Sequence, residues 1–174
     1  MWTNFQRSTW GQASCRRRTR HTFLLRALAV VVVLAVIAAA ADDPFTGTWK
    51  LNRGKSKLLP GDTTISDVYR TVADNNTIRI KEQMTDDRGV HNITVVARFD
   101  GKDYPVTGDP MSDSVSYERV KPDRIKITTK KGSQITAEAS TAVSRDGRTI
   151  TVHFVVYAGE KSQSGTAVYE KQPD

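Results

Sequence analysis

The sequence predicts an all-β domain, an antiparallel up-and-down β-barrel of about eight to ten strands, preceded by a helical targeting segment. From Phe45 onward, short runs rich in Val, Ile, Thr and Tyr alternate with turn dipeptides. No helical repeat of apolar residues persists beyond about two turns. Evenly spaced hairpin signals favour a meander, and closing the meander into a barrel removes its unpaired edge strands.

The N-terminal segment, residues 1–41, has the layout of a signal peptide. It contains six arginines and no acidic residue, followed by the apolar run 27–37 and four alanines. We expect cleavage near Ala40 or Ala41, which leaves a single exported domain, 42–174, in the periplasm or outside the cell. The uninterrupted run of 15 residues that ends at Ala41 is shorter than the roughly 20 needed to span a bilayer. We therefore expect no stable membrane anchor after cleavage; a retained anchor is the alternative.

The basic character of the chain belongs to this segment. The whole chain has 26 basic and 19 acidic residues and a net charge of +7; without the six arginines, 20 basic and 19 acidic residues remain, a net charge of about +1. This balance gives no reason to expect a nucleic acid as a partner. Cys15, the only cysteine, lies in the same segment and excludes a disulfide framework from the domain.

The strand runs and turns divide the domain regularly. Asp100-Gly101 and Asp146-Gly147 are typical of tight hairpins that need a positive φ. The longest gap, 53–64, predicts a short helical turn or a loop over one end of the barrel. We place strands at 45–52, 65–73, 77–84, 90–99, 102–107, 113–120, 124–130, 134–143, 149–157 and 163–171.

Alternation within the strands assigns their faces. Ile125 and Ile127 share one face while charged neighbours occupy the other. Ile150, Val152 and Phe154 repeat this pattern. We expect these apolar faces to point into the barrel.

Motifs at both ends of the domain resemble one group of proteins. Gly47-Thr48-Trp49 is similar to the Gly-x-Trp strand that opens lipocalins and, more closely, fatty-acid-binding proteins, and 168–171 resembles the final strand of the latter. The stretch 100–108 is similar to one found in uncharacterised secreted bacterial lipocalin-like proteins. The resemblance implies that Trp49 closes one barrel end and that Gly47 allows another segment to approach closely.

The resemblance also implies that the barrel lumen binds a small apolar or amphipathic molecule. Fatty-acid-binding proteins place an arginine two residues before the tyrosine of the final strand, where this sequence has Ala167 before Tyr169. We therefore expect weak affinity for free fatty acids and better binding of neutral or weakly polar ligands, because a buried carboxylate without a paired cation is disfavoured. The expected lumen residues are Trp49, Phe99, Ile150, Val152, Phe154, Tyr169 and Lys171.

Sequence signals for other chemistry are weak. His91 and His153 have neither metal-ligand nor triad-like spacing, so we expect no enzymatic activity, no metal and no cofactor. An acidic group is expected to consist of solvated turn residues: Asp100, Asp103, Asp109 and Asp113. A basic group is expected to form a solvated outer strand face: Arg119, Lys121, Arg124, Lys126, Lys130 and Lys131.

A second function remains open. A barrel filled with side chains would instead be a secreted interaction protein, for example a protease inhibitor acting through its loops. The size of the lumen distinguishes the two, because a small barrel either is filled by side chains or holds one small ligand. The sequence specifies no oligomeric state.

Overall fold

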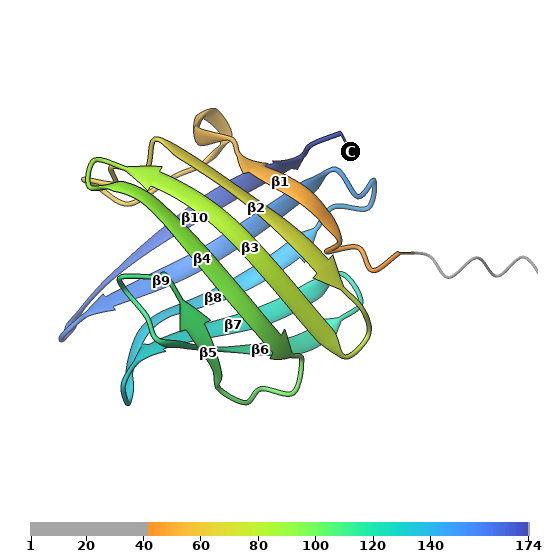
Figure 1. Cartoon of the computed structure of the whole chain (residues 1–174). Coiled ribbons are helices and arrows are strands. Elements are labelled where there is room, and N and C mark those ends of the chain that lie inside the picture. Colours follow the sequence, from red (N-terminus) through yellow and green to blue (C-terminus); the bar gives the residue numbers. More distant parts are fainter. Residues whose placement is uncertain (1–41, 174) are drawn as a thin grey trace, which may run out of the picture. The chain divides into compact units, whose positions relative to one another are not determined.

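The computed structural model describes residues 42–173, which form a closed antiparallel barrel (Figure 1). A short 3-10 helix, η1 (Arg53–Lys55), follows the first strand. The strands are β1 (Gly47–Leu51), β2 (Ser66–Ala73), β3 (Thr77–Asp86), β4 (Gly89–Arg98), β5 (Tyr104–Thr107), β6 (Ser114–Lys121), β7 (Arg124–Lys131), β8 (Gln134–Val143), β9 (Thr149–Ala158) and β10 (Lys161–Lys171).

Each strand pairs with its neighbour in the chain, and β1 closes the barrel by pairing with both β2 and β10. The prediction of an all-β meander is confirmed, and each predicted strand position has its counterpart. The predicted signal peptide lies outside the described residues. Within 42–173, no helix has the length and hydropathy needed to cross a bilayer.

Alternation along the strands builds the core. On β4, Ile93, Val95 and Ala97 are buried while the intervening Val96 is exposed, as expected for a strand with one face turned inward. The main cluster of buried apolar residues comprises Phe45, Trp49, Ile78, Val95, Ala97, Val115, Tyr117, Ile125, Val143 and Ile150.

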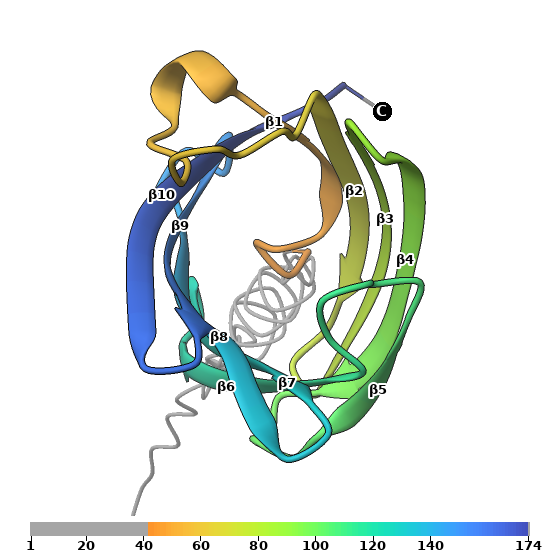
Figure 2. The same ribbon diagram turned by 90° about the vertical axis from the view of Figure 1, so that its left-hand side faces the viewer.

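The two ends of the barrel are built from different connections. The segment 42–46 and the β2–β3, β4–β5, β6–β7 and β8–β9 turns gather at one end, which we call the closed end. The long β1–β2 connection, including η1, and the β5–β6 loop lie at the other, which we call the open end. Figure 2 views the barrel nearly along its axis, with the strands surrounding a central space.

Two glycines permit close approaches. Gly47 has a φ of 147°, and a side chain there would lie 2.5 Å from Cε of Lys171. Gly108, with a φ of 85°, lies so close to the backbone carbonyl of Asn92 that a Cβ atom would overlap it. Only glycine fits either position without a shift of its neighbours. The first approach agrees with the role that the resemblance assigns to Gly47, and the second holds the β5–β6 loop against β4.

Candidate functional site

The barrel interior contains, toward the open end, a cavity of about 420 Å³. Its walls come from most strands, and its rim comes from the β1–β2 connection and the β5–β6 loop. Met111, on that loop, lines the cavity although its residue surface is 55 % exposed, so the cavity reaches the surface beside it. The rim residues are Leu58, Asp62, Thr64, Asp109, Met111 and Ser112.

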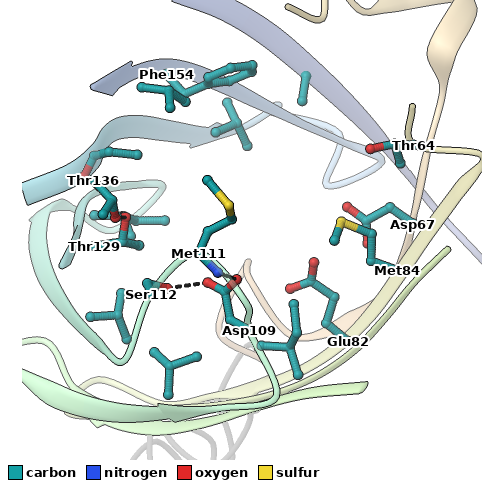
Figure 3. Close-up of a pocket in the computed structure, with 18 of the residues that line it drawn as sticks. Thr64, Asp67, Glu82, Met84, Asp109, Met111, Ser112, Thr129, Thr136 and Phe154 are labelled. Carbon is teal, nitrogen blue, oxygen red and sulfur yellow. Dashed lines mark hydrogen bonds between the residues drawn. The ribbon is translucent and has the colours of Figure 1, made fainter. Parts of the chain in front are cut away.

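The carboxyl groups of this cavity lie away from its large aromatic side chain, as Figure 3 shows. Asp67, Glu82 and Asp109 lie on one side, and Phe154 lies across from them. The apolar wall also includes Ile127, Val152, Val156 and Ala167. A molecule in this space would meet carboxyl groups beside Met84 on one side, and on the other side mostly hydrocarbon with the hydroxyls of Thr129 and Thr136.

A second cavity of about 190 Å³ lies deeper in the barrel. It is lined by Phe45, Ile78 and Ile150, among others, and shares part of its wall with the larger cavity. The shared residues are Glu82, Tyr117, Ile127, Val152 and Tyr169. These side chains therefore lie between the two spaces.

The acidic side of the larger cavity is centred on β2 and β3. Asp67 is only 5 % exposed, and its Oδ2 atom accepts a hydrogen bond of 2.6 Å from the Tyr169 hydroxyl. Its Oδ1 atom is buried and accepts no hydrogen bond from an N–H or hydroxyl group of the described residues, and the Asp67 carboxyl hydrogen-bonds with that of Glu82 when one of the two carries a proton. Tyr69 packs edge-to-face against Tyr169, with ring centroids 4.9 Å apart, and stands opposite Glu82 across the β2–β3 ladder.

Burial governs the protonation of these carboxyl groups. Loss of solvation, followed by the negative charges of Asp67 and Asp109, raises the pKa of Glu82 to about 8. Burial also raises the pKa of Asp67, although its hydrogen bond from Tyr169 acts in the opposite direction. The two carboxyl groups lie near enough for each charge to act on the pKa of the other, so the pair titrates as a unit.

The other two acids at the cavity have partners. Asp62 forms an ion pair of 3.3 Å with Arg53. Asp109 accepts hydrogen bonds from the backbone N–H of Met111, at 2.8 Å, and from the Ser112 hydroxyl. No Lys, Arg or His of residues 42–173 lines either cavity. Asp67, Glu82 and Asp109 therefore have no cationic partner among these residues, and of the three only Asp109 accepts hydrogen bonds from its own loop.

The closed end is filled by aromatic side chains. Trp49 is fully buried, and its indole N–H donates a 3.1 Å hydrogen bond to the carbonyl oxygen of Phe45. The ammonium of Lys171 lies 5.5 Å from the centre of the Trp49 ring. The position of Trp49 agrees with the role that the resemblance implies, closure of one barrel end.

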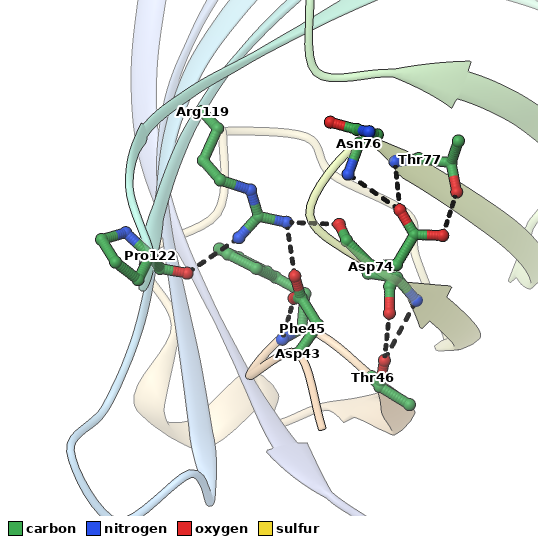
Figure 4. A network of polar contacts seen from close by, with 9 residues as sticks. Asp43, Phe45, Thr46, Asp74, Asn76, Thr77, Arg119 and Pro122 are labelled. Carbon is green, nitrogen blue, oxygen red and sulfur yellow. Dashed lines mark hydrogen bonds and ion pairs between the residues drawn. The ribbon is translucent and has the colours of Figure 1, made fainter. Parts of the chain in front are cut away.

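Arg119, whose side chain is 17 % exposed, completes this closure (Figure 4). The Arg119 guanidinium stacks on Phe99, 3.9 Å from the ring centre, and forms an ion pair of 2.6 Å with Asp43. It also donates hydrogen bonds to the backbone carbonyls of Pro122, at 2.9 Å, and Asp74, at 3.2 Å. Arg119 thus ties the segment before β1 to two turns of the closed end.

The structure divides the seven expected lumen residues into two groups. Val152 and Tyr169 line both cavities, Phe154 lines the larger one and Ile150 the smaller one. Trp49, Phe99 and Lys171 line neither of the two and lie at the closed end.

Two expectations about charged residues are wrong at one position each. Asp109 is not a solvated turn residue, because the β5–β6 loop turns it toward the cavity; Asp100, Asp103 and Asp113 are exposed as expected. Arg119 does not belong to a solvated outer face, because its side chain is only 17 % exposed and lies at the closed barrel end.

The sequence analysis missed Asp67 and Glu82, although a signal was present. Glu82 is in phase with Ile78 and Ile80, the inward residues of β3, and Asp67 is in phase with the inward-facing Tyr69. Reading strand parity through the charged residues would have placed both inside the barrel.

Comparisons with known proteins give little beyond this geometry. No protein-family model matches the chain. No curated protein matches it in sequence. One solved structure that it resembles is the crystal structure of Rv2717c from M. tuberculosis, at a TM-score of 0.46 and 14 % sequence identity, covering 75 % of this chain and 94 % of that one. At this level of similarity no property transfers from one protein to the other.

Within residues 42–173, no three His, Cys, Asp or Glu side chains are placed to hold a metal ion. The acidic side of the cavity offers carboxyl oxygens that can accept hydrogen bonds. Combined with the apolar wall around Phe154, it can orient a molecule that has one polar end.

Proposed function

We propose that this chain is an exported, lipocalin-like protein that binds one small apolar or amphipathic molecule in the barrel lumen. The observation that carries the proposal is the cavity of about 420 Å³ between the two rim segments. Its volume is typical of small-molecule sites, which are mostly apolar with a few convergent polar groups. The Tyr169–Asp67 pair provides such groups beside the wall formed by Val152 and Phe154.

The proposal assigns binding rather than catalysis to the barrel. Its partner is a small molecule and not a nucleic acid or a membrane, in keeping with the near-neutral charge of the domain. The cavities weigh against the alternative of a solid-cored interaction protein, because that alternative needs a lumen filled by side chains.

The buried Ala167 supports weak binding of free fatty acids. The position holds no cation, and the carboxyl groups of Asp67 and Glu82 lie at the same cavity. A ligand carboxylate placed there would be buried without a counter-charge and would face like charges.

Native mass spectrometry of protein purified from its own source, followed by titration with Nile red, tests the proposal. Ala137→Phe, which fills the larger cavity from β8, should weaken Nile red binding about tenfold or more. Ser140→Phe adds the same ring at an exposed position of the same strand and should leave binding unchanged. If no ligand co-purifies and Nile red shows no saturable binding, the carrier function is wrong.

A further inference from the structure

The acidic side of the larger cavity defines the chemistry of the ligand. We propose that the molecule bound in the lumen is a protonated organic amine, with its ammonium group between Asp67 and Glu82 and its hydrocarbon body against the wall around Phe154. This inference rests on the proposed function and specifies the class of its ligand.

The first argument is the Oδ1 oxygen of Asp67. This carboxyl is 5 % exposed, its Oδ2 atom accepts a hydrogen bond from the Tyr169 hydroxyl, and it hydrogen-bonds with the Glu82 carboxyl only when one of the two carries a proton. Two ionised carboxylates cannot hydrogen-bond to each other, so the ionised pair leaves Oδ1 without a donor, and a molecule in the cavity can supply one. Because Oδ1 belongs to a carboxyl group, a charged donor satisfies it best.

The second argument is the imbalance of charge. Asp67 and Glu82 face the lumen without a cation, whereas Asp62 has Arg53 and Asp109 has hydrogen bonds from its own loop. Placing acids together in a buried space is unfavourable for each of them, as the raised pKa of Glu82 reflects. A bound cation removes this cost, because it favours the ionised form of the pair.

The third argument is the match of donors and shape. An alkylammonium group offers up to three N–H donors around one charge, which suits acceptors that converge from β2 and β3 toward one space. Across the cavity, Phe154, Val152 and Ile127 offer only hydrocarbon. The carboxyl groups therefore favour the orientation in which the polar end of a ligand lies beside them and its apolar body lies toward Phe154.

The test uses three probes that share a body and differ in their head group: n-octylamine, n-octanol and n-octanoate. Each displaces Nile red from the protein near neutral pH. We expect octylamine to bind about tenfold to a hundredfold more tightly than octanol, because a charge-assisted hydrogen bond contributes a difference of this size. Octanoate should bind most weakly. Tryptamine and tryptophol repeat the comparison on an indole body.

Variants locate the effect. Asp67→Asn with Glu82→Gln removes both charges while keeping the shape, and it should reduce the preference for amine over alcohol to about threefold or less. Either single variant should reduce it less, because one carboxyl remains to ionise. Octanol binding should survive in the double variant, which reports that the cavity is intact. Glu118→Gln makes the same change at an exposed position on β6 and should have no effect.

Two results would overturn the inference while leaving the proposed function in place: equal affinity for octylamine and octanol, or an amine preference that persists in the double variant. Failure of every probe to displace bound Nile red would also overturn it. Absence of saturable Nile red binding would instead overturn the proposed function itself.

Discussion

At the closed end of the barrel, the charged side chain that points inward has a counter-ion; at the open end, the inward-pointing carboxyls of Asp67 and Glu82 have none among residues 42–173. Arg119 has an ion pair with Asp43, two backbone carbonyls and the face of Phe99, although its Nε atom has no hydrogen-bond partner among these residues. Asp67 accepts a hydrogen bond from the Tyr169 hydroxyl on Oδ2, and it hydrogen-bonds with Glu82 only when one of the two carboxyls is protonated. Since both ends follow the same strand alternation, the difference lies in what the connections supply.

This comparison separates stability from function. The segment 42–46 brings Asp43 and Phe45 to the closed end, where they satisfy Arg119 and cover Trp49. The β1–β2 connection and the β5–β6 loop bring Asp62 and Asp109 to the open end, where the cavity already contains the carboxyl groups of Asp67 and Glu82. We therefore expect substitutions at the closed end to destabilise the fold and substitutions at the open end to alter ligand binding.

The largest effect is expected at Trp49. Trp49→Ala removes a fully buried indole and should decrease the free energy of unfolding by about 3 to 5 kcal/mol. Urea denaturation followed by circular dichroism measures it. Ile65→Ala, at an exposed position, serves as the control and should change stability by about 0.5 kcal/mol or less. A loss at Trp49 no larger than at Ile65 would show that the closed end does not depend on this side chain.

The next effect concerns Arg119. Arg119→Ala leaves Asp43 without its counter-charge and should cost about 2 to 3 kcal/mol, as for a lost hydrogen bond to a charged group. Arg124→Ala, at an exposed position on the neighbouring strand, should cost about 0.5 kcal/mol or less. A double-mutant cycle with Asp43→Asn sharpens the test, since additive losses would mean that the ion pair contributes nothing.

Replacement of Glu82 should lessen a loss of stability, in contrast to the substitutions of Trp49 and Arg119, and its effect should depend on pH. Folding raises its pKa from the ordinary 4.5 to about 8, so its contribution to stability is fully present below about pH 4.5 and is lost as pH rises through about 8. Glu82→Gln should therefore reduce the loss of stability of the wild-type protein over this range. The titratable groups that influence Glu82 or line its cavity are Asp62, Asp67, Tyr69, Asp109, Tyr117 and Tyr169.

Thermal unfolding at a series of pH values measures this contribution, with Glu118→Gln as the control on the outer face. The same pH dependence in Glu82→Gln and in the wild-type protein would mean that Glu82 ionises in the folded state as it does in water. The carboxyl groups at the open end would then have no unfavourable interaction that a bound cation could relieve.

The smallest effect is expected at Lys171. Its ammonium lies 5.5 Å from the centre of the Trp49 ring, and Lys171→Ala should cost about 0.5 to 1 kcal/mol, the range of an exposed cation–π contact. Urea denaturation measures it, and ligand binding should not change because Lys171 lines neither of the two lumen cavities. Weaker Nile red binding in this variant would place the site nearer the closed end.

The sequence predicted the barrel well because its signals are local. Each strand has its own alternation, and turns such as Asp146-Gly147 lie between the strands that they connect. The parity of β9 was sufficient to place Val152 and Phe154 at the larger cavity.

The acidic site was harder to predict because it depends on contacts that are distant in sequence. Asp67 and Tyr169 are 102 residues apart, and the strand order that brings them together follows from closure of the barrel. Arg119 was misplaced for a related reason. Glu118 and Lys121 lie close to it in the sequence, and its partner Asp43, which holds it at the closed end, is 76 residues away.

Amide chemical-shift mapping by NMR during a titration with n-octylamine tests the difference between the two ends most directly. We expect the largest changes in amide chemical shift around Asp67, Glu82 and Tyr169 and at the rim near Met111. The amide chemical shifts near Arg119 should not change. Shifts concentrated at the closed end, or spread over the outer surface without saturation, would contradict this expectation.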